Sequence, residues 1–427
     1  MKIALINTPL VGRGGGQRQI LKLAVELQRF GHEVEIFTSA LNKEKCYPDM
    51  IEKLKVTVIP HPLGRKMPKM FIPSEILQKS NVDEESEVAG ATSSLRSWMR
   101  RAIGRQFYTI PYEFPSMINI GRKIPKGFDV INNHNFPSEW AAFTAKKRLN
   151  VPVVWMCNEP PIWFYTPESR RGLRKINWPI YEIIDKTAAD YIDEILVLSK
   201  IAQDHADKAY HRSSRIVRSG VDVEHFHNAS GKDIREKYGL EKDFVLLQVA
   251  NFQLSKGQVH SIKTLYELSK KYDRVKLILD GGGPKEDLVK LTEKLGVRDK
   301  VIFLHTNDDQ ELAKIYAACD VFLFPEQVTW GLALIEAMAG SKPVIVSNKC
   351  GASEIIQTNV NGVVFDLSHP DEIPKLVEGL MNNAELRRKI GEKAYEYVKS
   401  HLSWEKYARA MEIIFEESIL RFKQKTS

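Results

Sequence analysis

The chain has 427 residues, 43% of them hydrophobic and 27% charged, and 62 Lys and Arg against 54 Asp and Glu leave a net charge of +8. This is the composition of a globular protein of two or three domains, which excludes intrinsic disorder, collagen and disulfide scaffolds. Residues 1–200 carry 29 basic and 21 acidic side chains and residues 201–427 carry 33 of each, so the excess lies in the first half. We therefore expect different partners for the two halves, and nucleic acid, an anionic membrane surface and a phosphate-bearing acceptor are the candidates for the basic half.

Targeting signals and cysteine motifs are not evident in the sequence. No apolar run approaches the roughly 20 residues of a membrane span, and the opening MKIALINTPL lacks the long apolar region and cleavage site of a signal peptide. We expect a cytoplasmic protein. The cysteines have no CxxC spacing, so we predict free, mostly buried thiols at Cys46, Cys157, Cys319 and Cys350.

The first half alternates strand and helix signals. It starts with an apolar run at 3–6, a glycine-rich turn at 12–16 and a helical repeat that ends at Gly31. Further strand signals follow at 34–37, 55–59, 130–132, 153–155 and 195–198. This alternation predicts a parallel sheet covered by helices.

The second half repeats the same rhythm. Its strand signals lie at 244–249, 275–279, 301–304, 321–324, 344–347 and 363–365, with helical repeats between them. We predict two doubly wound α/β domains facing a central cleft, with ligands at the carboxyl ends of the strands. The predicted domains are 1–217 and 218–403, and the final helical repeat, in 404–427, is expected to return to the first domain.

Two motifs of the second half follow predicted strands. Residues 251–257, NFQLSKG, precede a helix, where backbone N–H groups and the ammonium of Lys256 would meet a phosphate. The alternative is an ordinary surface lysine. Residues 277–284, LILDGGGP, place three glycines at a strand end, which permits close backbone approach of a ligand but is also plain turn chemistry.

The most specific segment is 321–347, VFLFPEQVTWGLALIEAMAGSKPVIVS. It combines a buried strand, a proline-containing loop, a Trp-Gly pair, a short helix and a second buried strand. Glu336 lies one turn into the helix, four residues beyond Leu332, so its carboxylate could accept two ribose hydroxyls while a diphosphate rests on the helix N-terminus. The alternative is a glutamate that only stabilises the helix dipole.

Taken in order, the motifs resemble those of the retaining GT-B glycosyltransferases, specifically glycosyltransferase family 4. The resemblance runs from residue 12 to residue 366, through GRGGGQ, DVINNHN, VLSK, SGVD, NFQLSKG, LILDGGGP, WGLALIEAMAGSKPVIVS, GASEII and NGVVFD. It implies transfer of a hexose, of mannose or glucose type, from a GDP or UDP sugar to a saccharide or lipid-linked acceptor, with retention at the anomeric carbon. It also implies that no essential metal is bound, and the sequence has no suitably placed D-x-D cluster.

The resemblance assigns roles to individual residues. It places His134 near the donor sugar and the reaction centre, and Gly15 and Gly16 across the cleft from the diphosphate. The other donor-binding residues that it implies are Asn251, Lys256, Gly282, Thr329, Trp330, Gly331, Leu332 and Glu336. Asn158 and Glu159, after another strand, are the acceptor-side candidates. A purely structural role remains the alternative for His134 and for the Trp330 side chain.

Two departures of this chain from the family pattern concern the donor site. The first glutamate of the family's E-x7-E pattern would fall at position 328, which is Val328, and Glu326 stands two residues earlier. We expect Glu326 to reach the donor sugar through a re-threaded loop, and the alternative is that backbone groups alone hold the sugar. Asn251 replaces the family's arginine, so the diphosphate loses one cation and Lys256 should matter more.

Residues 95–107, LRSWMRRAIGRQF, predict a cationic amphipathic helix. Trp98 falls on its apolar side, and Arg100, Arg101 and Arg105 fall on the opposite side. Such a helix is typical of contact with a membrane surface, which would place the protein at the cytoplasmic face of a membrane. The alternative is a helix packed on its own domain. Nucleic-acid binding is disfavoured because no stacking aromatics are interleaved with the basic residues.

Two other functions remain open beside the glycosyltransferase. One is another GT-B sugar enzyme, such as an epimerase or a phosphorylase, which donor hydrolysis or phosphate-dependent cleavage without a transfer product would indicate. The other is a non-catalytic protein that binds a sugar nucleotide or a membrane, an alternative favoured by Val328 and Asn251. Tight nucleotide binding without turnover would indicate it.

Overall fold

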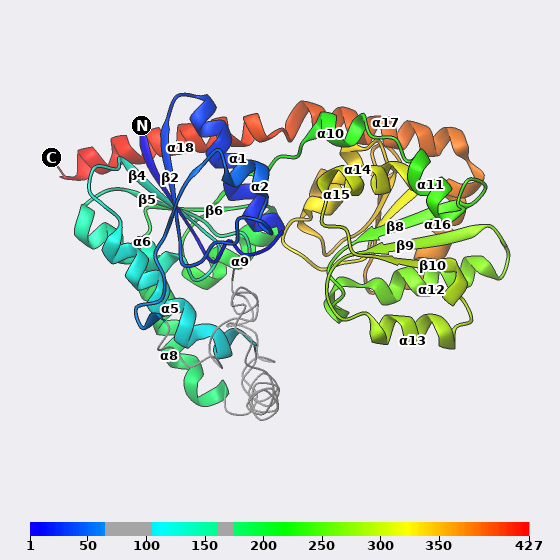
Figure 1. The fold of residues 1–427 in the computed structure, drawn as a ribbon, viewed down its shortest axis with the longest axis horizontal. Coiled ribbons are helices and arrows are strands. Elements are labelled where there is room, and N and C mark those ends of the chain that lie inside the picture. Colours follow the sequence, from blue (N-terminus) through cyan, green and yellow to red (C-terminus); the bar gives the residue numbers. More distant parts are fainter. Residues whose placement is uncertain (65–104, 161–173, 427) are drawn as a thin grey trace. The chain divides into compact units, whose positions relative to one another are not determined.

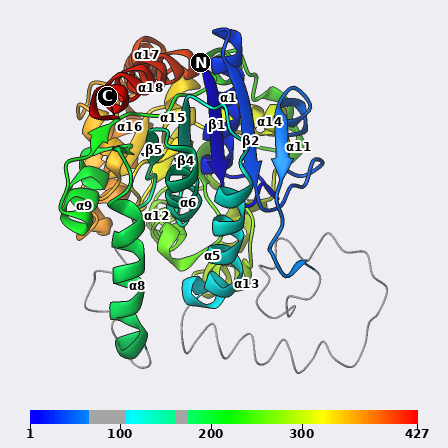
Figure 2. The same cartoon turned by 90° about the vertical axis from the view of Figure 1, so that its left-hand side faces the viewer.

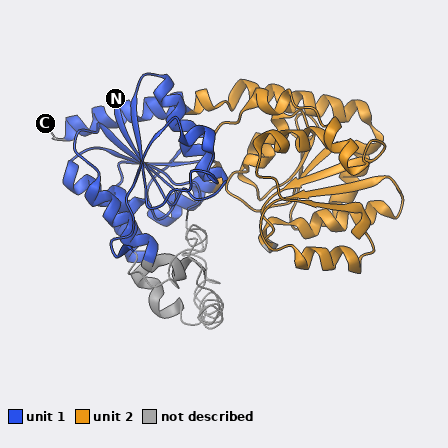
Figure 3. Ribbon diagram, viewed as in Figure 1, with its two compact units in different colours: residues 1–198, 202–217, 408–427 blue, residues 199–201, 218–407 orange. Residues whose placement is uncertain are grey.

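The computed structural model describes residues 1–64, 105–160 and 174–426 (Figure 1). The chain forms two units (Figure 3). Unit 1 comprises residues 1–198, 202–217 and 408–427, and unit 2 comprises residues 199–201 and 218–407. Each unit contains its own parallel sheet, as the alternation of strand and helix signals predicted.

The sheet of unit 1 has seven parallel strands in the order β3-β2-β1-β4-β5-β6-β7. The strands are β1 (Lys2–Asn7), β2 (Glu33–Thr38), β3 (Lys55–Val58), β4 (Val130–His134), β5 (Val153–Met156), β6 (Glu194–Val197) and β7 (Arg215–Ile216). Apart from Lys2, the residues of β1, β4 and β5 are buried, which is expected when helices cover both sides of a parallel sheet.

Helices cover this sheet on its two faces (Figure 2). They are α1 (Gly15–Arg29), α2 (Pro48–Ile51), α5 (Arg105–Lys123), α6 (Glu139–Leu149), α8 (Arg174–Ala189) and α9 (Lys200–Tyr210). In α1 the apolar residues recur at helical spacing, and Ile20, Leu23, Ala24 and Leu27 are fully buried. Helices α5 and α6 pack on each other and join one hydrophobic core with Ile6 and Trp155 of the sheet.

The last helix, α18 (Trp404–Thr426), begins in unit 2 and belongs to unit 1 from Ala408 onward. Its contacts with unit 1 are specific. The Arg409 guanidinium lies 3.5 Å from the centre of the Phe30 ring, and Glu412 Oε1 lies 2.7 Å from His32 Nε2. The chain therefore returns to its first unit, as the final helical repeat predicted.

The sheet of unit 2 has six parallel strands in the order β10-β9-β8-β11-β12-β13. The strands are β8 (Phe244–Val249), β9 (Val275–Asp280), β10 (Val301–Leu304), β11 (Val321–Phe324), β12 (Val344–Ser347) and β13 (Val363–Phe365). In both sheets the first three strands run outward in one direction, and the fourth pairs with the other side of the first. Each unit therefore has a topological switch point, between β1 and β4 and between β8 and β11.

The helices of unit 2 alternate with these strands. They are α10 (Val223–His227), α11 (Lys232–Tyr238), α12 (Gln258–Ser269), α13 (Glu286–Lys294), α14 (Asp309–Ala318), α15 (Leu332–Ala339), α16 (Ile373–Asn382) and α17 (Ala384–His401). Short 3-10 helices lie at η4 (Leu254–Lys256), η5 (Arg298–Lys300), η6 (Gly351–Ile355) and η7 (Pro370–Glu372). Within the described residues, no helix is both long and apolar enough to cross a membrane.

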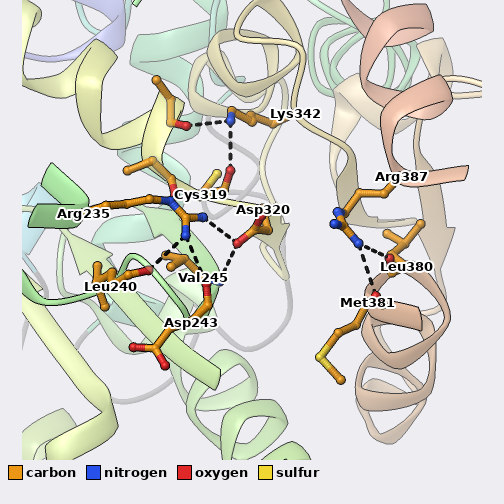
Figure 4. A network of polar contacts seen from close by, with 12 residues as sticks. Arg235, Leu240, Asp243, Val245, Cys319, Asp320, Lys342, Leu380, Met381 and Arg387 are labelled. Carbon is orange, nitrogen blue, oxygen red and sulfur yellow. Dashed lines mark hydrogen bonds and ion pairs between the residues drawn. The ribbon is translucent and has the colours of Figure 1, made fainter. Parts of the chain in front are cut away.

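A polar network fixes the amino ends of β8 and β11 (Figure 4). Arg235 of α11 donates from Nη2 to Asp320 Oδ2 at 2.7 Å, and the same oxygen accepts from Val245 N at 2.8 Å. Lys342 donates to the carbonyl oxygens of Ala317 and Cys319. A separate group in Figure 4 ties Arg387 to the carbonyl oxygens at the end of α16. This network does not involve the opposite, carboxyl ends of β8 and β11, where doubly wound sheets bind ligands.

Candidate functional site

The switch point of unit 2 brings two predicted motifs together. Strands β8 and β11 are neighbours in the sheet, with Val321 paired to Leu246, but they lead to strands on opposite sides, β9 and β12. The loops that follow them, residues 250–257 and 325–331, therefore leave the sheet edge in opposite directions. This divergence is where doubly wound sheets bind their ligands.

Gly257 sets how closely these two loops approach. Its φ is +72°, and a Cβ atom on it would lie 2.0 Å from the carbonyl oxygen of Pro325, so only glycine fits. This approach places Lys256 beside Glu326, with Lys256 Nζ 3.1 Å from Glu326 Oε2. The Lys256 side chain is 28% exposed and the Glu326 side chain 2% exposed.

Hydrogen bonds hold both members of this ion pair from the backbone side. Gln248 of β8 donates to the Lys256 carbonyl at 2.6 Å, and Ser347 of β12 donates to the Glu326 carbonyl at 2.5 Å. Burial raises the pKa of Glu326, whereas the Lys256 ammonium and the Gln248 amide act to lower it. Both residues of the pair were predicted from the sequence as site residues, but their contact with each other was not.

Helix α15 starts directly after the second loop. Gly331 precedes it with φ +134°, and a Cβ atom there would lie 2.9 Å from the Phe324 ring. No side chain caps the helix start, and Leu334 N and Ile335 N donate to the Gly331 carbonyl, so the N–H groups of Leu332 and Ala333 are the candidates for binding an anion. Thr329 accepts a hydrogen bond from Ser199 at its carbonyl.

The Trp330 side chain faces the interior instead of a ligand. It is 3% exposed, and its carbonyl oxygen accepts from Cys350 Sγ at 2.7 Å. The structural role that the sequence left as an alternative is therefore the one its indole has. Only the main chain of Trp330 remains a candidate for donor binding.

Glu336 is the fifth residue of α15 and is 6% exposed. Its Oε2 accepts a hydrogen bond from the hydroxyl of Tyr316 at 2.9 Å. Tyr316 is fully buried on α14, and its hydroxyl oxygen also lies 3.2 Å from the Ala333 carbonyl oxygen, which is the alternative acceptor for its single proton. Sequence reasoning missed Tyr316, because its position in a helical repeat indicated only a core residue.

A third part of this sheet edge lies after β9 and β10. Asn251 is exposed, and a Cβ atom on Gly282 would lie 3.5 Å from Asn251 Oδ1 and 3.1 Å from His305 Cε1. The structure thus brings the two predicted residues together and adds His305. The strand end at Leu304 was the available sequence signal for His305.

The switch point of unit 1 carries a network of buried amides. Asn7, the last residue of β1, accepts at Oδ1 from Asn135 Nδ2 at 2.9 Å, and Asn135 Oδ1 accepts from Asn158 Nδ2 at 2.9 Å. Asn158 Nδ2 also donates to Gln19 Oε1 at 2.6 Å. Gly16 lies against Asn135, and both Gly15 and Gly16 belong to the first turn of α1 rather than to a loop.

His134 is the last residue of β4 and pairs in register with Asn7. It is fully buried, and its Nε2 lies 2.8 Å from Asn132 Oδ1. Burial lowers the pKa of His134 to about 3, so its imidazole is uncharged at neutral pH. Glu159 is exposed next to Asn158. Of the residues at this edge, sequence reasoning missed Asn7, Gln19 and Asn135.

Most of the predicted membrane-contact residues lie outside the described part of the chain. These are Trp98, Arg100 and Arg101, whereas Arg105 is the first residue of α5. The described residues contain no group of three or more His, Cys, Asp or Glu side chains arranged to hold a metal ion.

Solved structures with the same fold match almost the whole chain. Anabaena HepE in complex with UDP-glucose matches with a TM-score of 0.71 and 15% identity, covering 97% of this chain and 99% of that one. Sucrose-phosphate synthase from Thermosynechococcus elongatus matches with a TM-score of 0.72 and 19% identity, covering 97% and 98%. At these identities the likeness shows the fold alone.

Curated relatives are more similar in sequence. An uncharacterized glycosyltransferase of Methanocaldococcus jannaschii is 27% identical over 296 residues, which are 66% of this chain and 73% of that protein. The GDP-mannose-dependent alpha-(1-6)-phosphatidylinositol monomannoside mannosyltransferase of Mycobacterium tuberculosis is 25% identical over 285 residues, 61% and 74% of the two chains. The D-inositol 3-phosphate glycosyltransferase of Saccharomonospora viridis is 23% identical and covers 96% of this chain and 90% of its own.

Two family models match consecutive parts of the chain. The model described as "Glycosyl transferase 4-like domain" matches residues 14–220, and the model described as "Glycosyl transferases group 1" matches residues 230–397. Together they cover both units apart from their ends and a short junction. The chain therefore belongs to the group 1 glycosyl transferases, the family 4 glycosyltransferases with the GT-B fold.

Proposed function

We propose that the protein is a retaining hexosyltransferase that takes its donor, a nucleoside diphosphate sugar, at the switch point of unit 2. The observation that carries this proposal is the arrangement of Lys256, the uncapped start of α15 and Glu336 around the ends of β8 and β11. A cation and helix N–H groups bind a diphosphate, and a fixed carboxylate accepts ribose hydroxyls. Asn251, Gly282 and the main chain of Thr329, Trp330, Gly331 and Leu332 complete the proposed donor site.

The chemistry follows from where charge develops. When the bond between the anomeric carbon and the diphosphate breaks, negative charge grows on the leaving phosphate oxygens. Lys256 and the N–H groups of α15 stabilise that charge, which lowers the barrier most if they are already in place before the reaction. The buried contacts around Gly257 and Gln248 keep them in place.

We assign the acceptor to unit 1. Amides bind hydroxyl groups as donors and acceptors, and Asn158 lies in the amide network at the sheet edge with Glu159 exposed beside it. His134 and the first turn of α1 at Gly15 and Gly16 line the same edge. A saccharide or lipid-linked acceptor fits this chemistry, and the Mycobacterium tuberculosis relative is named for a phosphatidylinositol mannoside.

Hexose and base are part of the proposal only as classes. The name of one relative contains GDP-mannose, and one structural neighbour was solved in complex with UDP-glucose. Mannose or glucose from a GDP or UDP donor is therefore proposed here.

A thermal-shift screen against UDP, GDP, UDP-glucose and GDP-mannose tests the donor site, because a ligand that binds only the folded protein raises its Tm. We expect the nucleotides of one base, either uracil or guanine, to raise the Tm of the wild type but not that of Lys256→Met. The control is Lys263→Met, which changes an exposed lysine of α12 and should behave as the wild type. Incubation of that donor with saccharide and lipid-linked acceptors should then give a transfer product with the α configuration kept. Hydrolysis or phosphate-dependent cleavage as the only reaction would contradict the transferase.

Contact with an anionic membrane surface is proposed for the basic residues of the first half. Replacing Arg100 and Arg101 by glutamate should reduce flotation with vesicles that contain anionic lipid, while activity on a soluble acceptor analogue is kept. Lys389→Glu with Lys393→Glu, two exposed charges of α17, is the matched control. Unchanged flotation of the arginine variant would refute the membrane contact.

A further inference from the structure

Glu326 is buried, as are Trp330 and Glu336 of the candidate donor site. Its side chain is 2% exposed, although it lies in a loop between β11 and α15. A carboxylate in such a position costs free energy unless a cation and hydrogen bonds compensate it. The Lys256 ammonium, 3.1 Å away, provides that compensation.

The geometry favours a contact with lysine over a contact with sugar. The backbone on both sides of Glu326 is fixed, because the Pro325 carbonyl lies against Gly257 and the Glu326 carbonyl accepts from Ser347. The Lys256 side chain, in contrast, is 28% exposed, so it contacts Glu326 and is also accessible to solvent. An ammonium has three N–H donors, so Lys256 can keep its bond to Glu326 and still donate to a phosphate oxygen.

We propose that Glu326 is a positioning residue for Lys256, which holds the ammonium at the donor diphosphate site, instead of contacting the donor sugar. This inference rests on the proposed donor site. It replaces the expectation that Glu326 reaches the sugar through a re-threaded loop. The position of the glutamate that the family pattern places near the sugar is Val328 in this chain.

The proposal predicts how nucleotide affinity depends on the pair. Glu326 holds the Lys256 ammonium at the diphosphate, so removing the carboxylate should weaken nucleotide binding while Lys256 is present. Without Lys256, only the repulsion between the carboxylate and the diphosphate is removed, so the same change should not weaken binding. A residue that contacts the sugar would behave differently. Its removal would weaken binding of the nucleotide sugar and leave the nucleoside diphosphate unaffected.

The test is a double-mutant cycle on the full chain with wild type, Glu326→Gln, Lys256→Met and the double variant, using calorimetric titration of UDP and GDP. We expect Glu326→Gln to raise the Kd of the bound nucleoside diphosphate about three- to tenfold, because the Lys256 ammonium is no longer held at the diphosphate. In the Lys256→Met background the same substitution should not raise the Kd, because it then removes only the repulsion between the carboxylate and the diphosphate. Glu267→Gln and Lys270→Met, the exposed ion pair at the end of α12, form the control cycle and should show no coupling.

Each outcome supports or overturns the proposal. An equal effect of Glu326→Gln in both backgrounds, or an effect on nucleotide sugar alone, would overturn the positioning role while the donor site stands. Absence of nucleotide binding by the wild type would overturn the donor site and this inference with it. If Lys256→Met alone does not fold because it leaves Glu326 charged and unpaired, Lys256→Arg replaces it. Arginine keeps the positive charge but has a different reach from lysine. If the effect of Glu326→Gln on the Kd is lost when residue 256 is arginine, Glu326 must act through residue 256.

Discussion

The two switch points of the molecule have the same topology and different chemistry. In unit 2 the loops after β8 and β11 carry an ammonium and carboxylates, Lys256 with Glu326 and then Glu336 on α15. In unit 1 the residues after β1, β4 and β5 form a network of amides beside an uncharged imidazole. The strand order decides where a ligand can bind, and the side chains at the strand ends decide which kind.

This difference separates the proposed partners physically. A cation such as the Lys256 ammonium stabilises a diphosphate strongly, whereas neutral amides bind hydroxyls without attracting phosphate. The basic excess of the first half is thus not located in the amide network itself. The comparison can be tested by substituting a residue at one sheet edge and measuring the binding of the ligand proposed for the other edge.

Lys256→Met should have the largest effect on the charged edge. Loss of a charge-assisted hydrogen bond of about 3 kcal/mol corresponds to roughly hundredfold weaker binding of the nucleoside diphosphate. Fluorescence or calorimetric titration measures this, with Lys263→Met as the control. If Lys256→Met binds the nucleoside diphosphate with wild-type affinity, the diphosphate does not bind at this edge.

Asn135→Asp should disrupt the neutral edge without touching the charged one. It places a carboxylate oxygen against Asn7 Oδ1, so we expect a loss of about 2 kcal/mol of stability and at least about a tenfold lower kcat/KM for the acceptor. Asn150→Asp is the control, because Asn150 has the same left-handed backbone (φ 55°) but is exposed. A weakened nucleoside diphosphate in Asn135→Asp would show that the two edges do not act separately.

His134 should make unit 1 sensitive to acid. Its folded pKa, about 3, lies below its usual value near 6.5, so the unfolded chain binds the proton first and stability is lost as pH falls below about 6.5. At pH 5 this amounts to about 2 kcal/mol. Melting curves between pH 7 and pH 5 should show a smaller decrease in Tm for His134→Gln than for the wild type and for His401→Gln, an exposed histidine of α17. Equal slopes would mean that His134 is protonated as easily in the folded protein.

Tyr316→Phe should have the smallest effect. It removes the hydroxyl that holds Glu336, and we expect about a five- to tenfold higher donor KM, because one typical hydrogen bond contributes roughly 1–1.5 kcal/mol. The matched control is Tyr272→Phe, because Tyr272 donates to Glu378 at 2.8 Å away from this edge. An unchanged KM would mean that Glu336 needs no support or does not hold the ribose.

The strands, most helices and the residues at the strand ends could be predicted from the amino-acid sequence. These follow from patterns within a few positions, such as the apolar run before Lys256 or the helical spacing after Gly16, and local patterns are set by neighbours in the chain. The family motifs also located Glu336 correctly on its helix.

Which of these residues meet is a property of the folded chain alone. The contact of Lys256 with Glu326, the hydroxyl of Tyr316 on Glu336 and the burial of His134 and Trp330 join segments far apart in the sequence. They depend on the placing of β11 beside β8 and of β4 beside β1, which is determined by the packing of whole helices on both faces of each sheet. No pattern of neighbouring residues carries that information, because pairing across a sheet arises only when distant segments pack together.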